Sequence, residues 1–381
     1  MEPDTPQQRL AQRHLSVGPS VSGSHCVSPD GTRLYYSNRQ AVVAVSLADA
    51  AVLFCIDFGC TVRSLVCAND AVLLVGDERG HVWEYAIADD RRTLLFEAGD
   101  VPVLSLVPCG ERLLIVTPLR AVVLRGGAVE DDIPSDVLLE TGTCFEESGD
   151  FYVVLALTDA SGTLAVRVNG VSHPPVAGVR SWVTCIAHAP GRLFCGTDSG
   201  KVRVLSLPAF ATEAVVPSSE VRVTAVSCVG AGFVSASIDT AIQFFTFDGL
   251  WLPRVCVGHV GEERYVRLAW AASTRTLVAL SNLAHVHAWT FDTELTHPTP
   301  LLLLTGHSDV VGSARLFPLP TEPPTLLLVT ASQDYTARVF GRTEDGRFVE
   351  LARPLVHGYP LAQLPLVRAD LSSSDEDAFP V

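Results

Sequence analysis

A pattern of about forty residues recurs along almost the whole chain of 381 residues. In each copy an opening apolar run leads through a turn to a second apolar run that ends at Asp or Ser near Gly, and a third apolar run follows. Successive copies are 37 to 45 residues apart, a period that is typical of units built from four short β-strands. The opening runs start near His25, Val62, Val103, Gly142, Val183, Val223, Tyr265 and Val310.

The clearest copy spans residues 183–216 and predicts each strand in turn. Residues 183–187, 192–196 and 201–205 are expected strands, and 214–216 closes the unit. The last of the three main runs alternates apolar and polar residues with period two, as a half-buried strand does. Asp198-Ser-Gly stands where a hairpin needs an Asx turn or a positive φ. Because no segment sustains a helical period of 3.6, the sequence predicts an all-β protein.

Eight such copies predict a single β-propeller of four-stranded blades, because one small sheet cannot cover its own faces and must stack on neighbours. Eight blades are favoured, and seven stay open because the blocks at 103–127 and 142–171 are degenerate. The expected boundaries are an N-terminal extension at 1–14, the propeller at 15–356 and a tail at 357–381. Either residues 10–17 or residues 347–351 supply the outer strand of the last blade.

Three segments resemble the WD-repeat family. The last block reads GHSD at 306–309, TASQD at 330–334 and VF at 339–340; Gly258-His259 precedes a block that ends at Trp289, and SASID stands at 235–239. The resemblance implies that His307, Ser332 and Asp334 form the hydrogen-bonded network that fixes a blade turn. Phe340 stands where the family has Trp, so that network lacks its indole donor. No block ends in Trp-Asp, since Glu84 follows Trp83.

Composition narrows the class of protein. Apolar residues make up 48% of the chain, but the apolar runs are too short to span a bilayer. The net charge is −15 with one lysine, Lys201, so generic nucleic-acid binding is disfavoured. The ten cysteines include no C-x-x-C pair, which indicates reduced thiols, and residues 1–14 lack the apolar core of a signal peptide. We therefore expect a protein of the cytoplasm or nucleus.

Catalytic motifs are missing from the sequence. It contains no G-x-S-x-G, phosphate-binding glycine loop or H-E-x-x-H, and we expect no enzyme activity, no cofactor and no metal. His285 and His287 share one strand face and could share a metal, but with no third ligand nearby we interpret them as packing residues. The acidic clusters at 130–132 and 146–147 are interpreted as solvated loops rather than acid–base groups.

Candidate binding residues lie beside the opening apolar runs, which in a propeller meet at one face of the ring. Trp and Arg dominate interface hot spots, and a ring of arginines could bind an acidic peptide or a phosphate group. The alternative is that these arginines pair with neighbouring carboxylates and that Trp182 packs between blades. The predicted site residues are Arg63, Arg180, Trp182, Arg222 and Arg264.

The C-terminal tail is acidic and of low complexity. Ser372, Ser373 and Ser374 each have an acidic residue three positions on, as acidophilic kinases prefer, and phosphorylation would add about −1.5 to −2 charges per site. The alternative is an unmodified solubilising tail.

Together these features predict a monomeric, non-catalytic scaffold that binds other proteins, some with acidic or phosphorylated segments, in a multi-subunit intracellular complex. The family resemblance and the acidic serine tail suggest ribosome biogenesis. One alternative is a subunit that binds RNA, an acidic peptide or a phosphopeptide through the arginine rim. Another is a propeller enzyme, which would need His, Asp or Glu converging on the central channel.

Overall fold

A computed structural model describes residues 24–356 with short gaps, at 39, 49–51, 160, 177–180, 240, 259–263, 283–284, 305–306, 308–310, 320–324, 333 and 343–347. Within these residues all regular structure is β, arranged as eight four-stranded antiparallel sheets. The predicted all-β class and the eight four-stranded repeats are thus confirmed. No helix in the described part of the chain is long and apolar enough to cross a membrane.

Each sheet is made by one continuous segment whose four strands pair in sequence order. The first four sheets contain β1 (His25–Val27), β2 (Arg33–Asn38), β3 (Ala41–Ser46), β4 (Val52–Asp57); β5 (Val62–Asn69), β6 (Val72–Asp77), β7 (His81–Ala86), β8 (Arg91–Glu97); β9 (Ser105–Cys109), β10 (Arg112–Thr117), β11 (Arg120–Arg125), β12 (Ala128–Pro134); and β13 (Leu139–Glu147), β14 (Asp150–Leu157), β15 (Leu164–Val168), β16 (Val171–Val176).

The next three sheets contain β17 (Val183–Ala189), β18 (Arg192–Thr197), β19 (Lys201–Ser206), β20 (Ala211–Pro217); β21 (Val223–Val229), β22 (Gly232–Ser237), β23 (Ala241–Phe247), β24 (Trp251–Gly258); and β25 (Tyr265–Ala271), β26 (Thr276–Ser281), β27 (Val286–Phe291), β28 (Pro298–Leu304). The eighth contains β29 (Val311–Leu319), β30 (Thr325–Ser332), β31 (Thr336–Arg342) and β32 (Phe348–Val356).

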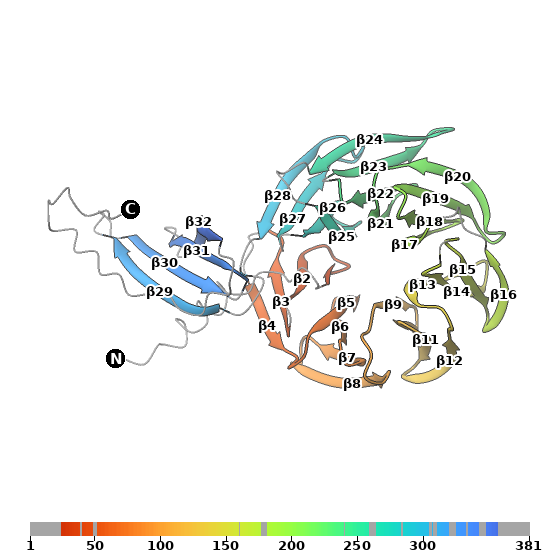
Figure 1. The fold of residues 1–381 in the computed structure, drawn as a ribbon, viewed down its shortest axis with the longest axis horizontal. Helices are drawn as coiled ribbons and strands as arrows, with labels where there is room; N and C mark the ends of the chain where they lie inside the picture. Colours follow the sequence, from red (N-terminus) through yellow and green to blue (C-terminus); the bar gives the residue numbers. More distant parts are fainter. Residues whose placement is uncertain are drawn as a thin grey trace. The chain divides into compact units, whose positions relative to one another are not determined.

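Sheets one to seven close into a ring. The chain divides into two compact units, and residues 17–308, which carry β1 to β28, form the larger. In this unit the first strand of every sheet contacts the first strand of the next, and β25 contacts β1. Figure 1 shows these first strands around the axis and β4, β8, β12, β16, β20, β24 and β28 on the rim. The ring in this unit therefore has seven blades, the form that the repeat pattern left open.

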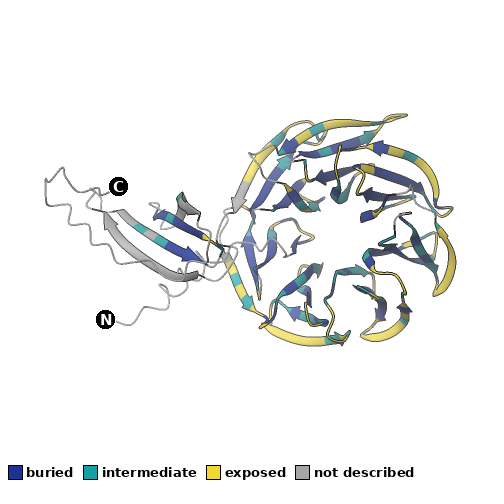
Figure 2. Ribbon diagram, viewed as in Figure 1, coloured by how far each residue is buried: buried dark blue, intermediate teal, exposed yellow. Residues whose placement is uncertain are grey.

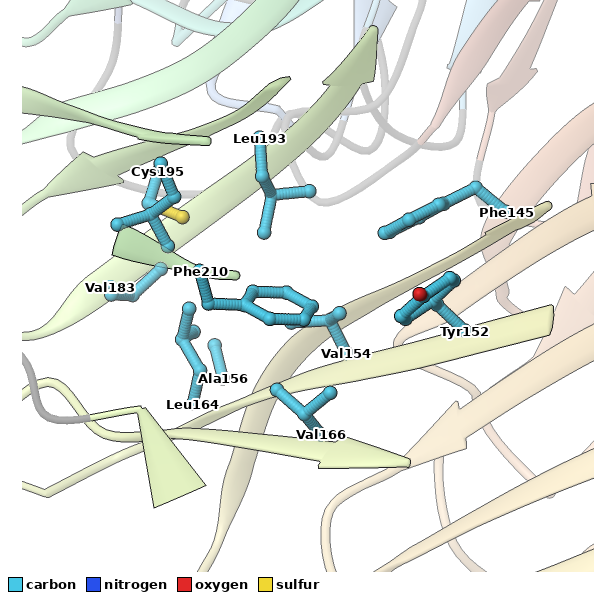
Figure 3. Packing of buried hydrophobic residues seen from close by; sticks show 11 residues of the cluster. Phe145, Tyr152, Val154, Ala156, Leu164, Val166, Val183, Leu193, Cys195 and Phe210 are labelled. Atoms are coloured by element: carbon cyan, nitrogen blue, oxygen red, sulfur yellow. The ribbon is translucent and has the colours of Figure 1, made fainter. Parts of the chain in front are cut away.

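The blades are held together by apolar clusters between neighbouring sheets. Seven clusters occur in the described part of the ring, one for each pair of neighbouring blades. In the cluster between blades four and five, the Phe145 and Tyr152 rings stack at 5.2 Å beside Leu193 and Phe210 (Figure 3). The two middle strands of a blade are the most buried, the inner strand is half-buried beside the axis, and the outer strand on the rim is mostly exposed, as blade five shows (Figure 2). Apolar burial between blades is thus the main stabilising term of the ring.

The turns between second and third strands have the backbone that the sequence predicts. Gly80 and Gly200 have φ of +83° and +78°. An added Cβ would lie 2.1 Å from the Gly99 carbonyl oxygen at Gly80 and 2.2 Å from the Ser219 carbonyl oxygen at Gly200. Both the positive φ and the close backbone approach require glycine.

Five inner strands share an irregularity at their second residue. The pairing of β5 with β6 skips Arg63, and the corresponding pairs in later blades skip Glu140, Thr184, Thr224 and Val266. Such a β-bulge leaves one residue outside the ladder and re-aims its side chain. All five of these residues border the cavity on the ring axis.

The eighth sheet belongs to the second compact unit, which comprises residues 1–16 and 309–381. Its fourth strand, β32, pairs with β31 and contains residues 348–351. Of the two segments predicted to supply this outer strand, 10–17 and 347–351, the second overlaps the observed β32. Residues 10–17 and the tail at 357–381 lie outside the described residues.

Candidate partner-binding site

The axis of the ring is an open cavity of about 590 Å³. Its lining comes from all seven inner strands and the residues just before them. The charged side chains in this lining are Arg63, Glu140, Arg222 and Arg267, and His25 lies among them. The cavity therefore carries three guanidinium groups against one carboxylate, in a protein whose overall net charge is −15.

One of the three guanidinium groups is neutralised across the channel. Nη2 of Arg222, just before β21, donates to Oε1 of Glu140 on β13 at 2.7 Å. Both side chains keep contact with solvent, at 42% and 37% exposure, so this is a screened surface pair of small energetic value. The pair links blades four and six and so bridges blade five, which begins with β17.

The opposite side of the cavity keeps its positive charge. Arg63, His25 and Arg267 come from β5, β1 and β25, which are neighbours around the ring. Burial lowers the pKa of Arg267, and the nearby Arg63 guanidinium lowers it further. Among the described residues neither arginine forms an ion pair or a side-chain hydrogen bond.

His25 adds no positive charge to this side at neutral pH. Burial, and secondly the charge of Arg267, lower its pKa to about 4. Its Nε2 lies 3.4 Å from the Val278 carbonyl oxygen in the neighbouring blade, so the neutral ring donates there. The two arginines are therefore the only charges on this part of the described wall.

The structure brings only part of the predicted arginine ring together. Arg63 and Arg222 both line the cavity. Trp182 and Arg264 stand before β17 and β25 and do not line it, although both are exposed, Trp182 at 46%. Arg180 lies outside the described residues. Trp182 is exposed rather than enclosed between blades, and the pairing of Arg222 with Glu140 matches the alternative interpretation for that arginine.

A second polar cluster fixes the turn of blade two. Asp77 is fully buried at the end of β6, and its Oδ2 lies 2.8 Å from Cys60 Sγ, 2.8 Å from His81 Nδ1 and 3.4 Å from Trp83 Nε1. Its Oδ1 accepts from two backbone N–H groups, those of Arg79 and His81. Cys60, Asp77 and His81 are also the one trio in the described residues whose atoms are close enough to share a metal ion.

The protonation states in this cluster fit hydrogen bonding. Burial and the Asp77 carboxylate raise the pKa of Cys60 to about 12, so the thiol is a donor. Burial works against ionisation of Asp77, but hydrogen bonds from Cys60 and His81 overcome it and lower its pKa. The carboxylate thus serves as an acceptor for five donors and holds the turn between β6 and β7.

The remaining histidine and serine candidates take separate places. The buried His285 and His287 have ring centroids 6.4 Å apart, and His287 stacks on Trp289 at 5.6 Å. In the second unit, Ser332 Oγ accepts from the Asp334 N–H, and Asp334 Oδ1 accepts from Thr336 at 2.7 Å. His307 is fully buried in the first unit, and its part in that network stays a prediction. Ser372, Ser373 and Ser374 lie outside the described residues.

The acidic clusters are not solvated loops, and that interpretation was wrong. Residues 130–132 lie on β12 and residues 146–147 at the end of β13. Arg112 donates to Glu130 at 2.6 Å and to Glu146 at 3.0 Å, and Arg120 donates to Asp132 at 2.7 Å. Arg120 and Asp132 lie on the paired strands β11 and β12, whereas Arg112 on β10 reaches Glu130 on β12 and Glu146 on β13 of the next blade.

Comparison with known proteins places this architecture. No family model matches the chain. The crystal structure of the RRP9 WD40 repeats overlays with a TM-score of 0.57 at 14% identity, covering 70% of this chain and 92% of that one. The WD40 β-propeller domain of Doa1 overlays with a TM-score of 0.61 at 13% identity, covering 73% and 95%. The fold of this chain is a β-propeller like those of these WD40-repeat structures.

Part of this propeller is similar in sequence to a known protein. Elongator complex protein 2 of Drosophila melanogaster is 32% identical over 143 residues. That match covers 35% of this chain and 17% of the length of the fly protein. This chain therefore spans a small part of the length of that relative.

Three ionisable residues of the cavity were not predicted as site residues from the sequence, namely His25, Glu140 and Arg267. The signal that could have found Glu140 is positional, because it follows the opening residue of its strand as Arg63 does in blade two. Arg267 stands one place beyond the bulge. The direction of the Arg267 side chain depends on the bulge at Val266, which shifts the pairing of β25 with β26 and leaves no mark in the periodicity of the sequence.

Proposed function

We propose that this propeller is a non-catalytic scaffold subunit of a multi-subunit complex in the cytoplasm or nucleus. The observation that carries the proposal is the closed ring, which presents a polar cavity and an exposed Trp182 beside the same set of inner strands. The cavity lining holds one carboxylate, Glu140, and that group is paired with Arg222. A channel enzyme would need several converging acids or histidines, which this lining does not supply.

The partner surface of the proposal is the face at the start of the inner strands. Trp182 and Arg264 are exposed there, and Arg222 is half-buried at the cavity mouth. Aromatic and arginine side chains give large contact areas and charge-assisted hydrogen bonds, so they contribute most at interfaces. Arg180 is included by its sequence position before Trp182.

The kind of complex follows from the relative with the shared sequence. Because Elongator complex protein 2 is by name a complex subunit, an Elongator-like assembly is the first candidate for this chain. The expectation of ribosome biogenesis stays a prediction, since the likeness to RRP9 at 14% identity concerns the fold.

The test is affinity purification from cells followed by mass spectrometry, with wild type and Arg222→Glu/Trp182→Ala compared. We expect a defined protein set with wild type and its loss from the double variant. The matched control is Arg254→Glu/Leu252→Ala, which changes an exposed arginine and an equally exposed apolar side chain on β24, the outer strand of the blade that begins after Arg222. Equal loss from both variants, or no defined set with wild type, contradicts the proposal.

A further inference from the structure

The inner wall between β25, β1 and β5 holds two arginines, Arg267 and Arg63, that form no ion pair with any described residue. Arg267 on β25 and Arg63 on β5 line the same axial cavity, and the charge of Arg63 adds to burial in lowering the pKa of Arg267. Bringing two like charges together inside a protein costs free energy, which the fold tolerates here without an ion pair from the described residues. An anion between them would remove that cost.

The position of Arg267 makes it available to a ligand. Its side chain is exposed to the cavity solvent although protein atoms surround it closely. A guanidinium in such a recess is partly desolvated, so its charge-assisted hydrogen bonds to an anion are stronger than those of a surface arginine. The cavity volume of about 590 Å³ lies inside the usual range of small-ligand sites, about 300–1,000 Å³.

Of this pair, only Arg63 has carboxylates in its neighbourhood. Glu140, the one carboxylate of the cavity lining, is already paired with Arg222. Arg63 also borders a second hollow with Glu78, Arg79 and Asp100, where two arginines face two carboxylates. Arg267 does not border that hollow, so its charge is directed to the axial cavity alone.

We propose that Arg267 and Arg63 form an anion site that takes the phosphoryl group of a phosphate monoester in the axial cavity of the ring. A phosphate monoester carries about −1.5 to −2 charges at neutral pH, which matches two guanidinium groups, and its oxygens suit their forked donors. The cavity is larger than a phosphoryl group, and the rest of the ligand occupies the remainder. This site does not depend on the scaffold role, because it is defined by the cavity wall alone.

The phosphoryl group has two sources, a phosphorylated side chain of another protein or a free phosphorylated small molecule. Isothermal titration calorimetry of the purified full chain with inorganic phosphate, blocked phosphoserine (N-acetyl, N-methylamide) and ribose 5-phosphate distinguishes them. Tighter binding of blocked phosphoserine indicates a protein source, and tighter binding of ribose 5-phosphate indicates a small molecule. Either outcome supports the site.

Variants locate the binding. Arg267→Gln and Arg63→Gln are each expected to weaken affinity about tenfold to a hundredfold, the effect of losing a hydrogen bond between charged groups. Arg267→Lys keeps the positive charge but lacks the two parallel N–H donors of a guanidinium, so its affinity should fall less than that of Arg267→Gln. The matched control is Arg254→Gln, an exposed arginine on the outer strand β24 that does not line the cavity, and the affinity of this variant should be unchanged.

The proposal is overturned if no probe binds the wild-type chain, or if Arg254→Gln weakens binding as much as Arg267→Gln does. Thermal melting of every variant checks that the ring is folded. Because Arg222 and Trp182 are unchanged here, a failure of this site leaves the scaffold test unaffected, and the reverse also holds.

Discussion

At the residue scale, Asp77 shows how one buried carboxylate can determine a turn. Five donors reach it, two from the backbone and three from Cys60, His81 and Trp83. A buried carboxylate is stabilised only if such donors compensate the loss of water. The five hydrogen bonds that stabilise the ionised Asp77 therefore also fix the backbone at the start of β7.

Asp77→Asn should loosen this turn. An amide keeps the size but replaces one acceptor oxygen by a donor that faces other donors, so we expect a loss of about 1–3 kcal/mol of local stability. Hydrogen exchange of the Arg79 and His81 amides, both bonded to Asp77, measures it directly. Asp30→Asn is the control, because Asp30 makes a similar but exposed turn with Thr32. Unchanged protection in Asp77→Asn would contradict this role.

Arg267→Gln should also change a neighbouring histidine. His25 has its pKa lowered to about 4, mainly by burial and secondly by Arg267. Removing the guanidinium is expected to raise the pKa of His25 while leaving it below 6.5, and an NMR titration of the ring measures this. Since the folded pKa is below the unfolded value, His25 supports stability above about pH 6.5 and that support is lost as the pH falls toward 4. An unchanged pKa would refute the contact.

At the element scale, strand positions were predictable and pairing registers were not. The predicted starts at His25, Val62, Val183, Val223 and Tyr265 are the first residues of β1, β5, β17, β21 and β25. In the two degenerate blocks the observed strands start elsewhere than predicted, at Ser105 instead of Val103 and at Leu139 instead of Gly142. Alternation defines a strand from its own residues, whereas a bulge depends on the partner strand. The cavity wall is built on bulges, and this is why Glu140 and Arg267 were missed.

The fourth strand of the last sheet carries a buried ion pair. Arg338 on β31 is 2% exposed, and its Nη1 lies 2.8 Å from Glu350 Oε2 on β32, with Asp334 3.8 Å away. Burial lowers the pKa of Arg338, while Glu350 acts in the opposite direction. The two strands are thus joined by a charge that cannot reach water.

Glu350→Gln should release β32 from the sheet. Breaking a buried pair by removing one partner costs about 3–5 kcal/mol, and we expect the lower end because Asp334 stays near. The double variant Arg338→Met/Glu350→Leu should recover part of the loss, since it removes the unpaired Arg338 charge but leaves Asp334 and Arg353 without these partners. Hydrogen exchange along β31 and β32 measures both. A double variant as unprotected as the single one would show that packing, and not charge, holds the strand.

At the scale of the whole ring, closure depends on packing between blades seven and one. Their cluster joins Leu34, Tyr36 and Val43 to Val278 and Leu280, all of them buried. No strand is exchanged between these sheets, because each is made by one continuous segment. The ring is therefore held by about the same interface at its closure as at its other six junctions.

The number of blades in the ring could not be predicted from the repeat for this reason. The period identifies blocks that fold as four-stranded sheets, and eight such sheets are observed. How many of them complete a circle depends on the angle between neighbours, which is set by side chains such as Tyr36 against Val278. These contacts join residues about 240 positions apart, beyond the reach of any local pattern.

A chain reduced to residues 17–308 should therefore fold by itself. It keeps all seven sheets and all seven apolar clusters, and β1 meets β25 without help from later residues. A ring that needed the eighth sheet would be left open by this truncation, with two apolar sheet faces exposed to water and a tendency to aggregate. We expect instead a monodisperse β protein that melts cooperatively within a few degrees of the full chain. Size-exclusion chromatography and circular dichroism decide between these outcomes, and Leu280→Ala in the truncated chain should lower its stability by about 2–5 kcal/mol, since that side chain fills the closing interface.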